Sequence, residues 1–313
     1  MNSPGPASAE STEKKIPISL VLGSGGARGY AHIGVIEELI SQGFDIRSVA
    51  GSSMGALVGG VYAAGKLEAF RDWVLTLARF DVLKLLDVTV RGGGFIKGNR
   101  IISALREHVG EVNIEDLPIS YTAVAVDLDA QREVWFSQGS LFHAIRASIA
   151  IPTIFRPHRY RGRLLVDGGL LNPLPVSPTL RDHTQATIAV DVNAPAEPLN
   201  EADDDRSAET DDGLVPRVRR MFGGKSSANS AADGSRDPSA IDLFARTLDT
   251  VQETITRLKL AAQPPDLLIT IPRNVCTFYD FHRAESVIEW GRKRTREALA
   301  RWTPPENGSR DQA

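Results

Sequence analysis

The sequence lacks the features that mark several protein classes. Its 313 residues include a single cysteine, Cys276, which excludes an internal disulfide framework and any multi-cysteine metal site. No apolar stretch approaches the roughly 20 residues that span a bilayer, and the polar N-terminus has no apolar signal core. With 36 basic and 39 acidic side chains, the chain also lacks the basic excess of a dedicated nucleic-acid binder. We therefore expect a cytoplasmic protein with no nucleic-acid partner, whose contact with membranes is at most peripheral.

The composition divides the chain into parts of different character. Apolar residues make up 42%, enough for a large core. The length suits either two domains or one large α/β domain, and we predict one folded domain over residues 16–304. Disordered tails are expected at 1–15 and 305–313. Residues 195–239 are rich in proline, serine, glycine and acidic residues and poor in large apolar ones, which predicts a disordered insertion.

Hydrophobic periodicity predicts strands and helices in alternation. Strands are expected at 16–22, 46–50, 121–128, 132–136, 163–166, 186–192 and 267–271. Helices are expected at 30–41, 56–64, 67–79, 99–109, 140–149, 240–262 and 284–302. Because the chain opens with two successive strand, glycine-rich turn and helix units, the fold class is predicted to be α/β, with a mostly parallel central sheet and helices on both faces.

A possible nucleophile stands between the second predicted strand and its helix, in Gly51-Ser52-Ser53-Met54-Gly55. The G-x-S-x-G pattern in this position is typical of a nucleophile elbow, a tight turn that projects the Ser53 hydroxyl out of the backbone. Gly51 and Gly55 remove side chains that would clash across the turn, and the following helix directs its positive end at the site. The alternative is an ordinary glycine-rich turn.

A second glycine-rich segment, residues 23–29, can expose consecutive backbone N–H groups to an anion. The dinucleotide pattern fails at Arg28, and no Gly-Lys-Ser/Thr follows as a phosphate-binding loop requires. An oxyanion hole for acyl transfer therefore fits the segment better than a nucleotide phosphate. Arg28 either hydrogen-bonds to carbonyls of the loop or is a solvated surface arginine.

The remaining candidates are one aspartate and the histidines that could act as a base. Asp167, followed by Gly168 and Gly169, ends a predicted strand and can present its carboxylate to a neighbouring turn, although a plain turn is the simpler interpretation. A serine nucleophile usually has a histidine base. No histidine stands in a recognisable catalytic context; they are His32, His108, His143, His158, His183 and His282.

Taken together and in this order, the motifs resemble the patatin-like phospholipase family, and more closely its bacterial branch. The resemblance rests on G-G-x-R-G at Gly25–Gly29, G-S-S-M-G at Gly51–Gly55, A-S-I-A-I-P at Ala147–Pro152 with Phe155, and D-G-G at Asp167–Gly169. It covers about residues 16–192 and extends to the final helices. It implies a three-layer sandwich and a lipid acyl hydrolase of phospholipase, lysophospholipase or esterase type.

The resemblance also implies roles for individual residues. Ser53 is the expected nucleophile and Asp167 its general base, working through an acyl-enzyme without a cofactor or a metal. Burial would strengthen the carboxylate as a base because desolvation raises its pKa. The remaining expected site residues are Gly25, Gly26, Ala27, Arg28 and Gly29 for the oxyanion hole, Gly51 and Gly55 for the elbow, and Gly168 and Gly169 for support of the aspartate.

Other interpretations remain open at this point. The fold could serve a regulatory protein with weak or no activity, a phosphate-binding regulator, or a small-ester hydrolase or acyltransferase with the same site. Residues 67–97 are either an acyl-chain path with a glycine hinge at 92–94 or ordinary core and loop; the apolar residues concerned are Trp73, Phe80, Leu83, Leu85, Leu86 and Phe95. The mixed basic and apolar stretch 215–222 either contacts an anionic membrane or is a solvated linker.

Overall fold

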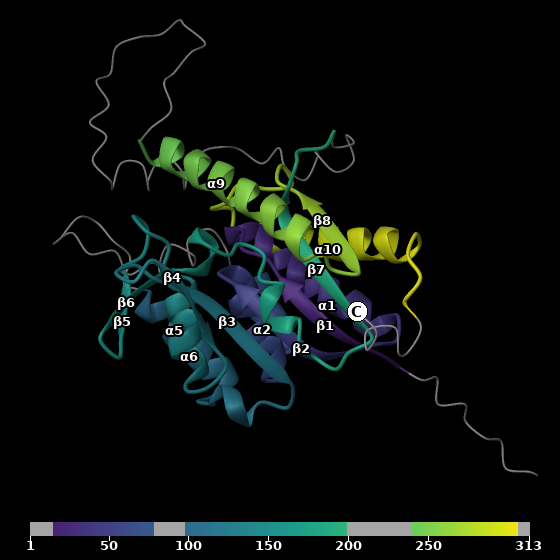
Figure 1. Cartoon of the computed structure of the whole chain (residues 1–313), viewed down its shortest axis with the longest axis horizontal. Helices are drawn as coiled ribbons and strands as arrows, with labels where there is room; N and C mark the ends of the chain where they lie inside the picture. The colour runs from purple at the N-terminus through teal and green to yellow at the C-terminus, as the bar shows by residue number, and fades with distance from the viewer. Residues whose placement is uncertain (1–14, 78–97, 199–239, 306–313) are drawn as a thin grey trace, which may run out of the picture.

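The computed structural model describes residues 15–77, 98–198 and 240–305, which are arranged around one mixed eight-stranded sheet (Figure 1). The main path of the sheet runs β5 (His158–Tyr160), β6 (Arg163–Asp167), β3 (Ser120–Asp127), β2 (Phe44–Ser52), β1 (Ile16–Leu22), β7 (Ala186–Ala194) and β8 (Leu267–Pro272), and β4 (Arg132–Phe136) pairs with β3. Neighbours from β3 to β8 along this path are parallel, whereas the pairs that involve β4, β5 or β6 are antiparallel. The predicted mostly parallel α/β sheet is confirmed.

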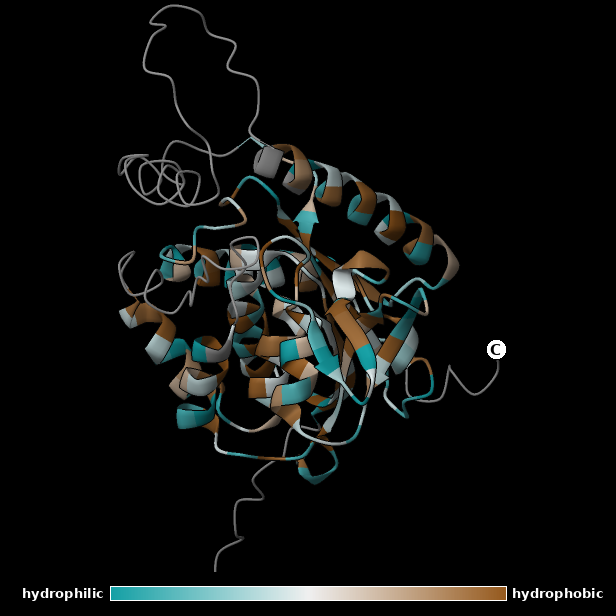
Figure 2. Cartoon of the chain, turned by 90° about the vertical axis from the view of Figure 1, so that its left-hand side faces the viewer, coloured by the Kyte–Doolittle hydropathy of each residue, from teal (hydrophilic) through white to brown (hydrophobic). Residues whose placement is uncertain are grey.

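Helices cover both faces of this sheet. Alternate residues of β1 separate the two cores: Ile18 and Leu20 belong to the large cluster, whereas Val21 belongs to a small cluster with Leu260. The large cluster is built with α1 (Ala31–Ser41), α2 (Met54–Ala63), α3 (Leu67–Thr76), α5 (Asn99–Val109), α6 (Leu141–Ser148) and α10 (Ala284–Leu299). Helix α9 (Ala240–Ala262) lies across the other face, near β7 (Figure 1). Figure 2 shows apolar residues, in brown, in the strands and, alternating with polar ones, along the helices.

The sheet topology brings the ends of β2 and β6 together. Strand β4 pairs with Ala123–Asp127 of β3 and occupies one edge of it, so β2 and β6 share the other edge. Strand β2 pairs with this edge as far as Val124, and β6 pairs with it from Ala125 onward. Because β2 runs parallel and β6 antiparallel to β3, their carboxyl ends meet head to head between Val124 and Ala125. The residues that follow these two ends are therefore neighbours.

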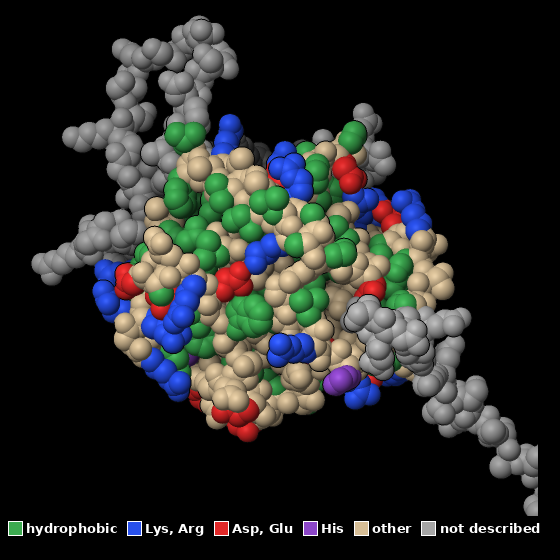
Figure 3. All heavy atoms as spheres, viewed as in Figure 1, with side chains coloured by type: hydrophobic (Ala, Val, Ile, Leu, Met, Phe, Trp, Pro, Cys, Tyr) green, Lys and Arg blue, Asp and Glu red, His purple; other side chains and the backbone are tan. Residues whose placement is uncertain are grey.

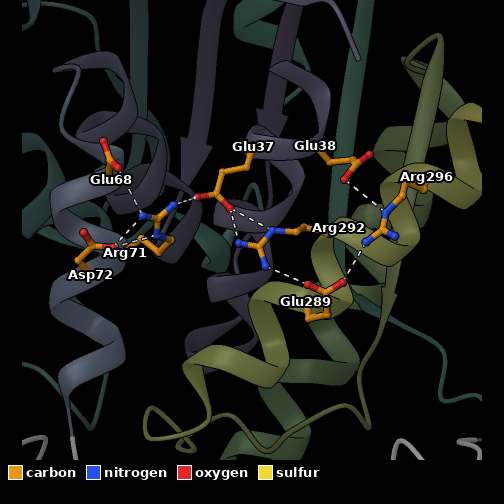
Figure 4. A network of polar contacts seen from close by, with 8 residues as sticks. All are labelled: Glu37, Glu38, Glu68, Arg71, Asp72, Glu289, Arg292 and Arg296. Carbon is orange, nitrogen blue, oxygen red and sulfur yellow. Dashed lines mark hydrogen bonds and ion pairs between the residues drawn. The ribbon is translucent and has the colours of Figure 1, made fainter. Parts of the chain in front are cut away.

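An ion-pair network ties α3 to the helices of the large core (Figure 4). Glu37 of α1 accepts from Arg71 of α3 at 2.8 Å and from Arg292 of α10 at 2.6 Å. Arg292 also pairs with Glu289 at 2.9 Å, so the network continues along α10. One carboxylate thus joins three helices and ties α3 to α1 and α10.

Most predicted elements are confirmed, and some boundaries differ. The helices expected at 99–109 and 240–262 have the predicted bounds, whereas the helix expected at 67–79 ends at Thr76. The expected turn at 51–55 shrinks to Ser53, because β2 continues to Ser52 and α2 begins at Met54. The short elements had not been predicted, namely strand β5 and the 3-10 helices at Gly26–Tyr30, Ile114–Asp116, Gly168–Leu170 and Ser177–Thr179.

Several expectations lie wholly or largely outside the described residues. They concern both tails, the 195–239 insertion, the 215–222 stretch and the acyl-path residues after Leu77, namely Phe80, Leu83, Leu85, Leu86, the 92–94 hinge and Phe95. In the three ranges that the structure describes, no helix combines the length and apolarity required to cross a bilayer.

Candidate active site

Ser53 is the single residue that joins β2 to α2, and its backbone is strained. Its φ of 54° and ψ of −121° form a combination that residues with a side chain rarely adopt. The flanking glycines make this turn possible. A Cβ on Gly55 would lie 2.1 Å from the Leu22 carbonyl oxygen, and one on Gly51 would lie 2.5 Å from the Ala56 nitrogen. Both close approaches are to backbone atoms that cannot move aside, so the turn requires both glycines.

Asp167 lies at the end of β6 and faces Ser53. Ser53 Oγ donates to Asp167 Oδ2 at 2.6 Å, and the backbone N–H of Gly169 donates to Oδ1 at 2.7 Å. Gly168 lets this turn pack against β3, since a Cβ there would lie 2.1 Å from the Val124 carbonyl oxygen. The two side chains predicted from separate motifs are thus in direct contact.

Burial makes the Asp167 carboxylate unusually basic. Asp167 is only 4% exposed, and the loss of water on burial raises its pKa from 3.8 to about 7. The hydrogen bonds from Ser53 and Gly169 pull the pKa the other way, but they are the smaller effects. A carboxylate with a pKa near neutrality can accept a proton from a serine hydroxyl far better than an exposed aspartate can.

Ser148, at the end of α6, holds the backbone of Ser53 from behind. Its Oγ accepts a hydrogen bond from the Ser53 N–H at 2.9 Å and donates to the Val124 carbonyl at 2.6 Å. The residue is fully buried. Sequence reasoning noticed the A-S-I-A-I-P stretch but gave Ser148 no role. The only available signal was a serine within a motif of otherwise apolar residues.

The glycine-rich loop runs beside Ser53, and one of its expected donors is occupied. Ser24 and Gly25 line the same small pocket as Ser53 and Asp167. The Ala27 N–H, however, donates to the Phe278 carbonyl at 3.0 Å. This bond corrects the expectation that Ala27 belongs to the oxyanion hole, because its N–H already has a partner. The partner lies in a segment 251 residues further along the chain, which local sequence reasoning could not foresee.

Arg28 braces the loop and is not a solvated arginine. It is 3% exposed, its Nε donates to the Gly25 carbonyl at 3.3 Å, and its Nη2 pairs with Asp249 of α9 at 3.3 Å. Its guanidinium therefore holds the glycine-rich loop from behind, so Arg28 has a structural role in this loop. Gly29 has a packing role, because a Cβ on it would lie 2.5 Å from the Met54 side chain.

Helix α9 closes the pocket from the opposite face of the sheet. Leu248 and Gln252 line the pocket, and the Gln252 Oε1 accepts a hydrogen bond from Ser24 Oγ at 3.2 Å. These two partners are 228 residues apart in the chain. Sequence reasoning predicted the helix but could not place it over the site.

The described histidines stand apart from this pocket, since none is among the described residues that line it. His32 is fully buried in α1, where its Nε2–H donates to the Gly23 carbonyl at 2.8 Å. Burial lowers the pKa of His32 to about 4, so the ring stays neutral and serves the loop structurally. His158 stacks on His143 at 5.3 Å between ring centroids, in a separate cluster.

An apolar cavity of about 100 Å³ opens on the other side of Ser53. Its walls come from the glycine loop, α2, α3, α5 and the segment after α6, and they are almost entirely hydrocarbon. Trp73, for which an acyl path and an ordinary core position were both left open, is among the lining residues, as is Leu77. The full lining is Gly26, Tyr30, Ser53, Met54, Leu57, Phe70, Trp73, Leu77, Ile101, Leu105, Ile149, Ile151, Phe155 and Phe281.

Comparison with known proteins places the chain in a family. The family described as "Patatin-like phospholipase" matches residues 20–180. An uncharacterized NTE family protein of Mycobacterium tuberculosis (strain H37Rv) is 40% identical over 342 aligned positions, which cover 95% of each chain. The chain belongs to the patatin-like phospholipase family. The expected fold and family are thereby confirmed, and the broad class of a lipid hydrolase follows from the membership.

More distant relatives share only part of the chain. A neuropathy target esterase of Drosophila persimilis is 35% identical over 165 residues, or 50% of this chain and 11% of the esterase. Among solved structures, VipD from Legionella pneumophila aligns with 80% of this chain and 67% of its own, at a TM-score of 0.37 and 14% identity.

Proposed function

We propose that this patatin-like protein is a serine-dependent lipid acyl hydrolase that works through a Ser53–Asp167 dyad. The observation that carries the proposal is the 2.6 Å contact between Ser53 Oγ and a buried carboxylate, at the mouth of an apolar cavity. The strained turn at Ser53 holds its hydroxyl against Asp167 at the end of β6, where the basic carboxylate can take the proton. We further propose that residues 16–304 form one hydrolase domain.

Acylation begins with attack of Ser53 Oγ on the ester carbonyl carbon. As the new C–O bond forms, the hydroxyl proton passes to Asp167 Oδ2, and the carbonyl π electrons move to oxygen to form an oxyanion. The tetrahedral intermediate then collapses, the ester C–O bond breaks, and the leaving alcohol takes the proton from Asp167. The product of this half-reaction is an ester between the fatty acid and Ser53.

Deacylation repeats the same steps with water. Asp167, again a carboxylate, accepts a proton from a water molecule as that water attacks the acyl-enzyme carbonyl. The intermediate collapses, the proton returns to Ser53 Oγ, and the free fatty acid leaves. One carboxylate can serve both halves because its pKa of about 7 lets it hold and release a proton near neutral pH.

The oxyanion is assigned to backbone N–H groups of the glycine loop at Gly25 and Gly26. Gly26 opens the 3-10 helix, so its N–H has no acceptor within that helix. Its φ is +57°, and a Cβ on it would lie 2.6 Å from the Phe278 carbonyl oxygen, so the position has no room for a side chain. Loss of one such donor typically slows turnover by roughly 10²- to 10³-fold.

The acyl chain is assigned to the apolar cavity that borders Ser53. Phe70 and Trp73 of α3 line it together with Leu105 of α5, whereas Met54 and Leu57 of α2 line it close to the nucleophile. Burying hydrocarbon against such walls stabilises the bound substrate by about 0.8 kcal/mol per methylene. The cavity therefore favours long acyl chains over short ones such as the acetyl group.

The test is hydrolysis of p-nitrophenyl esters from butyrate to palmitate by the wild type, Ser53→Ala and Asp167→Asn. We expect turnover by the wild type that increases with chain length up to a limit, and none above background in either variant. Trp73→Ala should move the preferred chain to a longer one without loss of butyrate activity. No Ser53-dependent turnover on any ester would refute the proposal and favour a regulatory protein on this fold.

A further inference from the structure

Helix α9 presents two different faces. Its inner face reaches the active site through Leu248 and Gln252. On its outer face Leu243, Val251 and Leu258 are 56%, 43% and 65% exposed. At 3.6 residues per turn these three side chains fall within about 80° of the helix circumference. They mark out a stripe, which we call the α9 stripe, along the helix that covers the pocket.

The threonine hydroxyls of the stripe are hydrogen-bonded within the helix. Thr247, Thr250 and Thr254 lie between the apolar side chains, and all three are exposed. Each hydroxyl donates to the carbonyl four residues earlier in the helix, at 2.8, 2.8 and 3.0 Å respectively. Because these hydroxyls are already bonded, moving this face out of water leaves no donor unpaired. The threonines therefore add methyl groups to the stripe.

The acidic side chains Asp249 and Glu253 of α9 have ion-pair partners, whereas two of its basic side chains border the stripe. Arg246 and Arg257 are exposed along one border of the stripe. Asp249 pairs with Arg28, and Glu253 pairs with Arg273 at 3.1 Å. Figure 3 shows apolar side chains gathered over α9 with basic side chains close by. With these two acids paired, Arg246 and Arg257 make the described part of this edge basic, which suits an anionic surface.

A tryptophan stands beside the same surface. Trp135 of β4 is 47% exposed and donates from Nε1 to Glu133 Oε2 at 2.9 Å. Glu133 Oε1 in turn accepts from Lys259 of α9 at 2.7 Å. Trp135 is thereby held near the C-terminal third of α9. Tryptophan prefers the boundary between hydrocarbon and water, where its ring is buried and its N–H stays bonded.

We infer that the α9 stripe, with Trp135 and the two arginines, docks the enzyme on an anionic lipid surface. The inference rests on the proposed function, since a hydrolase of lipids must meet its substrate at such a surface. The inner face of the same helix lines the Ser53 pocket, so docking places the site next to the membrane. A second copy of the chain is a poorer occupant, because a two-fold contact with the two α9 helices antiparallel would place the arginine borders close to each other.

Binding can be measured without catalysis on the Ser53→Ala protein. The probes are vesicles of phosphatidylcholine alone and of phosphatidylcholine with about 30% phosphatidylglycerol. We expect binding to the anionic vesicles, and about tenfold weaker binding for each of Val251→Ser and Leu258→Ser, since each removes hydrocarbon from the contact. Arg246→Gln with Arg257→Gln should weaken anionic binding and its salt dependence while leaving the phosphatidylcholine result unchanged.

The matched control is Ile40→Ser, which removes an apolar side chain of 42% exposure from α1 on the opposite face of the sheet. It should bind vesicles like the parent. If the stripe variants also bind like the parent, the inference is overturned. It is equally overturned if light scattering shows that the stripe mediates a dimer that these variants dissociate.

Failure of the docking inference and failure of the proposed function give different results. In proteins that retain Ser53, the stripe variants should hydrolyse p-nitrophenyl butyrate at the parental rate but act more slowly on vesicle phospholipid. If the parent binds vesicles through the stripe yet hydrolyses no ester, the docking surface stands and the proposed activity falls. If the parent hydrolyses dissolved esters but does not bind vesicles, the proposed activity stands and the docking inference falls.

Discussion

The basicity of Asp167 can be tested through the pH dependence of turnover. Only the carboxylate form can take the Ser53 proton, and burial raises its pKa from 3.8 to about 7. The activity should therefore rise with pH through neutrality. At about pH 6 only roughly one-tenth of the enzyme has an ionised Asp167, so kcat/KM should be about one-tenth of its plateau. For an unperturbed aspartate the same limb would lie near pH 4.

A substitution in the pocket separates this explanation from others. Leu248 is part of the apolar lining around Asp167, so Leu248→Ser should admit water and reduce the desolvation that raises the pKa. We expect the acid limb to move to lower pH by about one unit. Leu258→Ser is the matched control, because it makes the same change on the outer face of α9 and should leave the limb in place.

The same pKa predicts a stability effect with a definite sign. A carboxyl whose folded pKa is raised destabilises the fold once the unfolded chain ionises, and this cost grows from about pH 4 until it levels off above about pH 7. Asp167→Asn removes the cost, so it should stabilise the protein by about 4 kcal/mol at pH 8 and about 2 kcal/mol at pH 5. Urea unfolding at both values measures it. An acid limb near pH 4, or an Asp167→Asn variant that is no more stable at either pH, would refute the argument from burial.

Three further predictions concern the frame around the dyad. Ser53→Gly should be more stable than Ser53→Ala by about 1–2 kcal/mol in urea unfolding, because only glycine adopts the backbone of Ser53 without strain; a less stable glycine variant would mean that the turn stores no strain. Ser148→Ala should lower kcat about 10- to 100-fold with KM nearly unchanged, since it leaves the Ser53 N–H without its acceptor; steady-state kinetics on one ester checks this, and a change in KM alone would contradict it. Glu37→Gln should lower the free energy of unfolding by about 1 kcal/mol, and less in high salt, because Glu37 joins Arg71 and Arg292; thermal unfolding at two salt concentrations checks this, and an effect independent of salt would point to packing instead.

Local patterns in the sequence were enough to predict the tight turn at Ser53 and most of the secondary structure. The G-x-S-x-G stretch predicted a tight turn at Ser53, and the structure gives that residue a positive φ of 54°. The helix at 240–262 was predicted from its periodicity with the right bounds. Both are properties of short segments, since glycine spacing and apolar periodicity act over one or two turns of chain.

Contacts between distant segments could not be predicted in this way. The occupied N–H of Ala27 depends on Phe278, and the position of Gln252 over the pocket depends on how α9 crosses the sheet. The pairing of Ser53 with Asp167 was expected only through the family resemblance. Its physical origin is the head-to-head meeting of β2 and β6 on β3, which requires the strand order of the whole sheet.

The site concentrates two unfavourable features, a strained serine and a buried carboxylate, where the two strand ends meet. Each would relax if the neighbouring backbone could shift. Gly55 lies against the Leu22 carbonyl and Gly168 against the Val124 carbonyl, in both cases at distances that no side chain could occupy. These contacts are made to strands in the centre of the sheet, whose hydrogen bonds hold them in place. The rigid centre of the sheet thus keeps the Ser53 hydroxyl and the Asp167 carboxylate in contact, although the strained backbone of one and the buried charge of the other both cost stability.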